Sequence, residues 1–171
     1  MDLSDSYASK PAVGTYGYAV MIISKDFKIK GNFGPVGGQT YYSTSTFESS
    51  STDIADYATT TAPLKSFGGS GECIAYTEGE TVTGGTISAY LLNSSGTMLE
   101  SDSSAGVTEC TGQVQLLGVM DMSSDLTITE STGGLKMTFL VTDNGMSVIT
   151  NSSGTELYMD SGPFSVSFDT F

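Results

Sequence analysis

The side chains best suited to bind a small molecule are aromatic residues and one methionine on predicted strands. Their rings and thioether can line a cavity for an apolar or aromatic ligand, with tyrosine hydroxyls fixing its orientation. The same side chains can equally form a solid core, and the sequence leaves both interpretations open. The predicted ligand-binding residues are Tyr16, Tyr18, Phe27, Phe33, Tyr41, Tyr90, Met137 and Phe139, with Tyr42 beside them.

Composition excludes several kinds of catalytic site. The chain has no histidine and no arginine, so it lacks the base of a Ser-His-Asp or Cys-His system and the usual bidentate clamp for phosphate. Acid–base catalysis would depend on Asp, Glu, Tyr or Lys. Only Glu72, Glu109 and Glu130 lie near strand interiors, where burial raises a carboxyl pKa. The sequence therefore assigns no catalytic residue.

Two cysteines, Cys73 and Cys110, each follow a glutamate near the start of a predicted strand. We predict an intramolecular disulfide between them, which would stabilise the fold by about 4 kcal/mol in the chain-entropy model. Such a bond indicates an extracellular or periplasmic protein, whereas two reduced thiols would indicate the cytoplasm. A nucleophilic or metal-binding thiol is disfavoured, because there is no His partner and no CxxC spacing.

The formal net charge of -13 argues against binding to nucleic acid or to an anionic membrane surface. It is typical of an acidic, soluble surface. No stretch has the length and apolarity of a membrane span, and the first ten residues lack a signal-peptide core, so we expect a mature secreted form. The acidic clusters at 78–80 and 121–125 do not match a calcium-binding loop. We predict no metal and no cofactor.

Apolar side chains recur at every second position along most of the chain, which is the pattern of strands with one buried face. The sequence predicts a flexible leader at 1–12 and a single all-β domain at 13–171. In the first strand, Tyr16, Tyr18, Val20 and Ile22 share one face, opposite small residues, as in a barrel wall. The predicted strands are 13–23, 26–33, 39–47, 72–77, 85–92, 97–101, 112–120, 126–130, 135–142, 146–150, 155–159 and 164–168.

Between these strands the sequence carries connection and turn signals. Residues 48–71 form a long polar connection that suits a lid and has room for a short helix at 51–58. The pair Asn144-Gly145 favours a type I′ hairpin turn, because both residues tolerate positive φ. The heptapeptide at 93–99 is echoed at 151–157, which indicates two similar hairpin turns.

Several of these segments together resemble a group of small, mostly uncharacterised lipocalin-like (calycin-type) β-barrels. The matching segments are Gly14–Tyr18, Gly34–Gly38, Glu109–Gly112 and Phe139–Thr150, and the resemblance spans most of residues 13–162. Lipocalin relatives usually carry Gly-x-Trp in the first strand, and here Tyr16 stands in the place of the tryptophan. The resemblance implies a single antiparallel barrel of about eight strands, with an interior able to hold one small ligand.

Three functions remain open. The leading one is non-catalytic binding of a small, largely apolar molecule inside the barrel. A second is a cyclase or isomerase of a biosynthetic pathway, which holds a flexible substrate in a reactive conformer within an apolar cavity. A third is a structural or surface assembly protein whose strands pack against copies of itself, which would make the protein a homo-oligomer.

Overall fold

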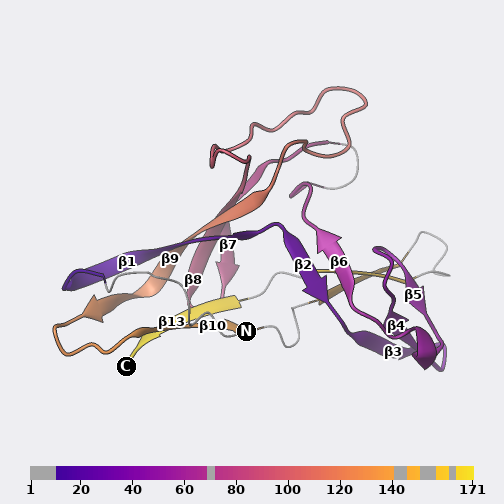
Figure 1. Cartoon of the computed structure of the whole chain (residues 1–171), viewed down its shortest axis with the longest axis horizontal. Helices are drawn as coiled ribbons and strands as arrows, with labels where there is room; N and C mark the ends of the chain where they lie inside the picture. The colour runs from indigo at the N-terminus through magenta and orange to yellow at the C-terminus, as the bar shows by residue number, and fades with distance from the viewer. Residues whose placement is uncertain (1–10, 69–71, 141–145, 151–156, 162–164) are drawn as a thin grey trace.

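The computed structural model describes residues 11–68, 72–140, 146–150, 157–161 and 165–171 (Figure 1). Within these residues the chain is all-β, as the alternating sequence pattern predicts, and every paired strand is antiparallel. The predicted helix near 51–58 is a single 3-10 turn, Ile54–Asp56, capped by the Asp53 carboxylate on the backbone N–H of Ala55. Most of the predicted leader lies outside the described residues.

A four-stranded sheet is the largest unit, and its strand order is β1-β9-β8-β7. Strands β7 and β8 form a hairpin, while β1 pairs with a strand about a hundred residues later in the sequence. This order leaves β1 and β7 as the two edges of the sheet. The strands are β1 (Gly14–Ser24), β7 (Tyr76–Val82), β8 (Gly85–Leu92) and β9 (Gln115–Ile128).

The inner face of this sheet carries the core. On β8 and β9, Ala89, Leu91, Leu116 and Met120 alternate with residues of the other face and are buried, with Leu91 fully so. Ala75, Cys73 and Cys110 join this cluster, and side chains from neighbouring segments pack against it. Those partly buried neighbours are Ile23, Phe27, Leu64, Phe67, Leu99 and Val107.

The face of β1 that carries its large side chains points away from this core. Tyr18, Val20 and Ile22 are 64%, 66% and 55% exposed, while Ile23, on the opposite face, packs against the core cluster. The sequence pattern predicted that Tyr16, Tyr18, Val20 and Ile22 share one face. The structure places Tyr18, Val20 and Ile22 in solvent, whereas Tyr16 is half-buried, because the register with β9 shifts between Tyr16 and Tyr18. The opposite face, which carries Met21 and Ile23, is the one turned toward the core, because Ile23 pairs with the buried Leu116 of β9.

Two small sheets continue from β1. One pairs β2 (Asp26–Ile29) with β6 (Thr60–Pro63), and the other has the order β3-β4-β5. Buried Ser43 joins these segments: its Oγ donates to the Ala58 carbonyl at 2.7 Å and accepts from the Gly31 N–H at 3.2 Å. The three strands of the second sheet are β3 (Asn32–Val36), β4 (Gln39–Ser43) and β5 (Ser50–Ser51).

The last four strands pair in a nested order. Strand β10 (Leu135–Leu140) pairs with β13 (Ser165–Thr170), and β11 (Met146–Thr150) pairs with β12 (Leu157–Ser161) between them. The predicted Asn144-Gly145 turn lies outside the described residues. The described strands before and after it, β10 and β11, pair with β13 and β12. A turn signal marks a reversal of the chain and does not choose the strand that each arm joins.

The predicted disulfide is confirmed: Cys73 and Cys110 are bonded, with their Cα atoms 4.6 Å apart. Both half-cystines are buried, and Cys73 also forms an isolated antiparallel bridge with Asp102. The bond therefore ties the segment before β7 to the loop that precedes β9. A disulfide is compatible with an oxidising compartment.

The predicted single barrel is not confirmed. In the described part of the chain the strands form five separate sheets, and none of these closes on itself. Figure 1 shows the four-stranded sheet on one side and the β3-β4-β5 sheet at the opposite end. No helix among the described residues is long and apolar enough to cross a membrane.

Candidate functional site

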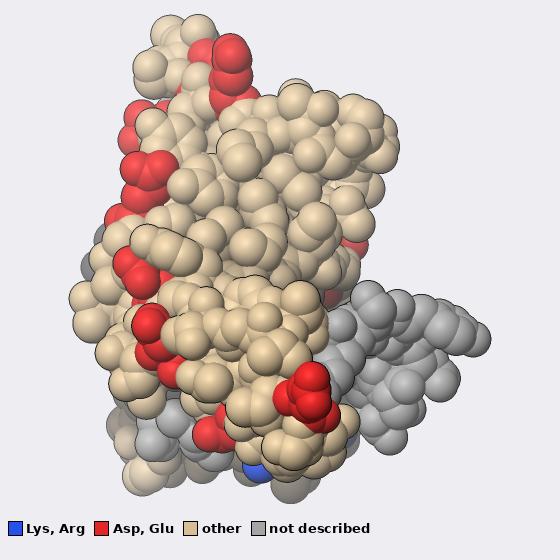
Figure 2. Space-filling model, turned by 90° about the vertical axis from the view of Figure 1, so that its left-hand side faces the viewer, with Lys and Arg blue, Asp and Glu red and all other residues tan. Residues whose placement is uncertain are grey.

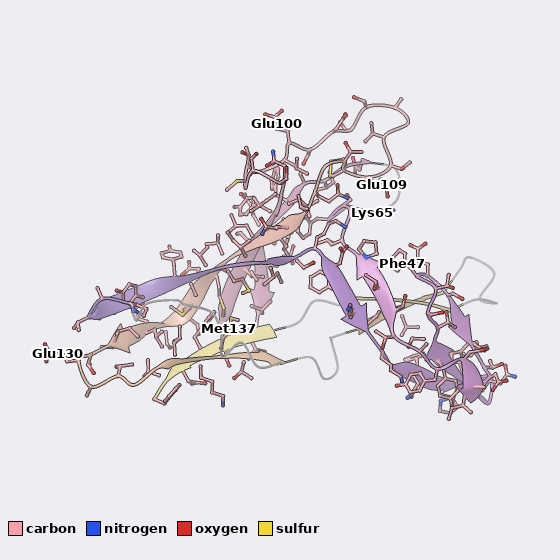
Figure 3. The ribbon with its side chains drawn as sticks, viewed as in Figure 1. Phe47, Lys65, Glu100, Glu109, Glu130 and Met137 are labelled. Atoms are coloured by element: carbon pink, nitrogen blue, oxygen red, sulfur yellow. A yellow bond between two sulfur atoms is a disulfide. The ribbon has the colours of Figure 1, made fainter. Side chains whose placement is uncertain are left out.

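The predicted ligand-binding side chains are spread over four of the five sheets. Tyr16, Tyr18 and Tyr90 belong to the four-stranded sheet, and Phe27 on β2 packs against the core cluster. Figure 3 shows Met137 beside β10 and β13, apart from the three-stranded sheet. The remaining members are Phe33 and Tyr41, which lie opposite each other on β3 and β4, and Phe139 on β10, whose side chain is outside the description.

What the structure does assemble is a continuous apolar surface, which we call the outer face of the four-stranded sheet. It consists of the side chains that point away from the core on all four strands. The pairing register joins them in rows, because residues directly opposite each other in antiparallel strands share a face. The outer face comprises Tyr18, Val20, Ile22, Tyr76, Tyr90, Leu117 and Val119.

One row crosses the whole sheet. It runs from Ile22 on β1 to Leu117 on β9, Tyr90 on β8 and Tyr76 on β7. A second row places Val20 opposite Val119, which in turn lies opposite Ser88. A carboxylate enters the third row, where Tyr18 lies opposite Asp121, and another, that of Glu78, lies beside Tyr90 at the β7 edge. The centre of the outer face is therefore apolar and uncharged.

Two tyrosines and a glutamate form the β7 side of the outer face. The rings of Tyr76 and Tyr90 stack with their centroids 6.1 Å apart, and Tyr76 remains 47% exposed. The Tyr90 hydroxyl donates a hydrogen bond of 2.9 Å to the Glu78 carboxylate. This hydrogen bond and the negative charge of Glu78 raise the pKa of Tyr90 above 10.0.

The Glu78–Tyr90 hydrogen bond predicts a measurable pH dependence. Since the pKa of Tyr90 is raised in the folded state, the bond stabilises the fold at pH values below the unfolded pKa, and this contribution is lost as the pH rises through the raised pKa. We expect Glu78→Gln to lower the pKa of Tyr90 towards 10.0. Absorbance titration of tyrosinate measures the change. In a Tyr90→Phe background, Glu78→Gln should leave the titration curve unaltered. If the same shift of the curve appears in that background, it belongs to another tyrosine.

Sequence reasoning missed three members of the outer face: Leu117, Val119 and Tyr76. A signal for two of them was present, because residues 116–120 read Leu-Leu-Gly-Val-Met, with apolar side chains at both parities of one strand. A strand apolar at both parities has two apolar faces. Tyr76 joins the outer face only through its pairing with Tyr90, which is not visible in the sequence.

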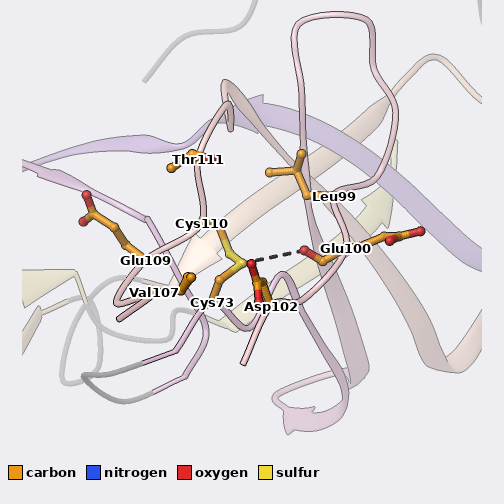
Figure 4. A pocket seen from close by; sticks show the side chains of 8 residues that line it. All are labelled: Cys73, Leu99, Glu100, Asp102, Val107, Glu109, Cys110 and Thr111. Carbon is orange, nitrogen blue, oxygen red and sulfur yellow. Dashed lines mark hydrogen bonds between the residues drawn. A yellow bond between two sulfur atoms is a disulfide. The ribbon is translucent and has the colours of Figure 1, made fainter. Parts of the chain in front are cut away.

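A second candidate is a pocket of about 220 Å³ beside the disulfide (Figure 4). Its volume lies below the about 300–1,000 Å³ of typical small-molecule sites. The carbonyl oxygen of Glu100 lies 3.7 Å from Cys73 Sγ, so part of the wall is backbone. The eight lining residues are Cys73, Leu99, Glu100, Asp102, Val107, Glu109, Cys110 and Thr111.

Two of the carboxylates around this pocket, those of Asp102 and Glu109, make local contacts. Glu109 accepts from Lys65 Nζ at 2.7 Å, and this hydrogen bond and its charge raise the pKa of Lys65 (Figure 3). Hydrogen bonds from the side chain and backbone of Ser104 lower the pKa of Asp102. Both ion-pair partners are nearly half exposed, so the pair contributes little to stability.

None of the three carboxylates considered for catalysis is buried. Glu72 and Glu130 are exposed, and Glu109 is the surface partner of Lys65. The three carboxylates therefore lie in contact with solvent. Among the described residues, no three Asp, Glu or Cys side chains are grouped in a way that could hold a metal ion.

Comparison of the chain with protein-family models, curated proteins and solved structures finds no match. The resemblance to lipocalin-like barrels therefore stays a prediction. The outer face and the disulfide pocket are the two surfaces from which a function can be argued, and the outer face is much the larger.

Proposed function

We propose that this chain is a structural protein that assembles with other protein chains outside the cytoplasm, and that it does so through the outer face. The observation that carries this proposal is a set of exposed apolar side chains along β1, namely Tyr18, Val20 and Ile22. Leu117 and Val119 on β9 extend this apolar surface. Large contiguous apolar surfaces on soluble proteins usually mark interaction sites.

The energetics favour a protein partner. Full burial of a Val or Ile side chain stabilises a complex by about 1.5–3 kcal/mol, and these side chains are more than half exposed. Tyrosine adds a large, rigid contact area with a polar tip, which is why it is enriched at interfaces. A flat sheet face offers this area to another flat surface, whereas a small molecule needs a concave site.

The distribution of charge fits the same function. The chain carries 19 acidic residues against six lysines. Figure 2 shows acidic side chains along one side of the molecule and a broad neighbouring area without charged side chains. Interfaces are depleted of charge at their centres, and acidic surroundings keep the unassembled protein soluble.

Ligand binding in a lipocalin-like barrel, and a cyclase built on the same barrel, are the alternatives. Both require the sheets to close around an apolar cavity that Tyr16 and Tyr18 face. The exposure of Tyr18 and the modest pocket volume favour assembly over either alternative. Location in an extracellular or periplasmic compartment is part of the proposal and draws support from the Cys73–Cys110 disulfide.

Sedimentation velocity over a wide range of concentrations tests the proposal. We expect the wild-type mass to rise with concentration, and Val20→Lys to weaken association about tenfold or more, because it places an ammonium group among the exposed apolar side chains of the outer face. Val36→Lys is the matched control, since Val36 is an exposed strand valine in another sheet and should leave association unchanged. A wild-type protein that stays monomeric throughout the range would overturn the proposal.

A further inference from the structure

The Cys73–Cys110 bond forms part of the wall of the disulfide pocket. Each half-cystine is only 3% exposed, but both line this cavity of about 220 Å³. A water molecule occupies about 30 Å³ in the liquid, so a cavity of this size admits a small thiol. The pocket is therefore an approach from solvent to the two sulfur atoms.

Backbone hydrogen bonds hold both half-cystines at this wall. The N–H of Cys73 donates to the Asp102 carbonyl at 2.9 Å, and the N–H of Asp102 donates to the Cys73 carbonyl at 2.8 Å. The N–H of Cys110 donates to the Lys65 carbonyl at 3.0 Å. A reagent that enters the pocket of the folded protein thus meets the S–S bond with the surrounding side chains in place.

The charges around the pocket are mostly negative. Its lining includes the carboxylates of Glu100, Asp102 and Glu109, and Figure 4 shows the disulfide between Glu109 on one side and Glu100 and Asp102 on the other. Lys65 Nζ lies 2.7 Å from Glu109 and offsets its charge. Among the described residues, neither Glu100 nor Asp102 forms an ion pair. Two negative charges are therefore left uncompensated beside the bond.

The chemistry available at this wall is thiol–disulfide exchange. A thiolate that enters the pocket attacks one Sγ, a new S–S bond forms, the Cys73–Cys110 bond breaks, and the other half-cystine leaves as a thiolate. A second thiolate attacks the reagent's sulfur in this mixed disulfide. The products are two reduced cysteines and the oxidised dimer of the reagent, so atoms and electrons balance.

The uncompensated carboxylates oppose the approach of an anion. Every attacking thiolate is negative, but an ammonium group on the same molecule offsets its charge, whereas a carboxylate on it doubles that charge. In water, one unit charge about 8 Å from another changes a rate by about twofold. Two carboxylates acting on reagents that differ by two charges thus separate the rates by about tenfold or more.

We propose that the disulfide pocket is a site of thiol–disulfide exchange that selects thiols by charge, accepting thiols that carry an amine and repelling thiols that carry a carboxylate. This inference concerns a different surface from the outer face and does not depend on the proposed assembly. It assigns to Glu100 and Asp102 the role of screening the bond from anionic thiols.

Rates of reduction by three small thiols test the proposal. Cysteamine carries an amine, 2-mercaptoethanol is neutral and 3-mercaptopropionate carries a carboxylate. The rate with each thiol, at low ionic strength and about pH 8, is divided by its rate with 2-hydroxyethyl disulfide, because this neutral reference removes differences in thiol pKa and nucleophilicity. Alkylation of the freed cysteines followed by mass spectrometry measures the reduced fraction. We expect the normalised rate for cysteamine to exceed that for 3-mercaptopropionate about tenfold, with 2-mercaptoethanol between them.

A charge-neutral variant locates the selectivity. Glu100→Gln with Asp102→Asn keeps the size of both side chains and should lower the ratio to about threefold or less. Asp121→Asn with Asp125→Asn is the matched control, because it removes the same charge from β9 residues that do not line the pocket, and it should keep the wild-type ratio. About 1 M salt should also reduce the wild-type ratio, since it screens charges beyond a few ångströms.

Two results would overturn the proposal. A normalised wild-type ratio below about twofold would mean that the bond is reduced only after the fold opens, without passing the pocket charges. An equal ratio in the wild type and in the Glu100→Gln, Asp102→Asn variant would assign the selectivity to other charges. Urea-unfolded protein gives a further check, because selectivity that survives unfolding unchanged comes from neighbours in the sequence and also contradicts the proposal.

Discussion

Replacement of both half-cystines, in a Cys73→Ala, Cys110→Ala variant, is expected to lower the free energy of unfolding by about 4 kcal/mol. The bond closes a loop with a sequence separation of 37, and the chain-entropy model gives about this value for such a loop. Both sulfur atoms belong to the core cluster, so the substitutions also remove buried contacts. Since typical domains are stable by about 5–15 kcal/mol, the loss removes a large share of the total.

Urea unfolding of the wild type and of the variant, at equal concentration, measures this effect. Reduction of the wild-type protein is the control for packing, because it opens the same loop while keeping both sulfur atoms. We expect the reduced protein to lose most of the same free energy. A change below about 1 kcal/mol in both cases would mean that the bond constrains little of the unfolded chain.

Substitution of Gly85 by alanine is expected to destabilise the β7–β8–β9 region by about 3 kcal/mol or more. Gly85 begins β8 with φ 155°, and a Cβ atom there would overlap the Asp121 carbonyl oxygen on β9. The clash is with backbone, so it is relieved only by separating the two strands. Strained φ and a steric clash therefore combine at one residue.

Gly79→Ala is the matched control for this prediction. Gly79 also has positive φ, 70°, but a Cβ atom at this position would have no neighbour within 4 Å. Gly79→Ala should lower the free energy of unfolding by only about 1 kcal/mol, the cost of positive φ for a residue with a Cβ atom. Urea unfolding compares the two variants, and amide hydrogen exchange in β8 and β9 shows where the damage lies. If both variants lose the same free energy of unfolding, the clash between the new Cβ atom at residue 85 and Asp121 is easily relieved.

The local features of this fold could be predicted from sequence because they depend on neighbouring residues. Alternation of apolar side chains located β1 to within one residue at each end, and it gave β8 and β11 the same bounds as the structure. The first copy of the repeated heptapeptide is a turn in which the Asn93 side chain accepts from the Ser95 and Thr97 N–H groups. Its second copy lies mostly outside the described residues.

Pairing between distant strands could not be predicted in this way. Side-chain period shows that Tyr18, Val20 and Ile22 share a face, but whether that face is buried depends on what β9 presents, about a hundred residues later. The same holds for the predicted ligand-binding set, since proximity of Phe33 to Tyr90 would have required a closed barrel. The disulfide could be predicted, because a protein with two similar cysteines has one possible intramolecular pairing.

The pairing of β1 with β9 also bears on synthesis of the chain. Gln115, the first residue of β9, follows Ser24, the last residue of β1, by 91 residues. At about 5–20 residues per second, a ribosome needs roughly 5–20 seconds to complete that interval. Throughout this time β1, uncharged and apolar, has left the ribosome without its partner strand. The nascent chain thus passes through a period in which β1 is exposed without its partner strand, and its contacts during that time affect how many chains reach the native sheet.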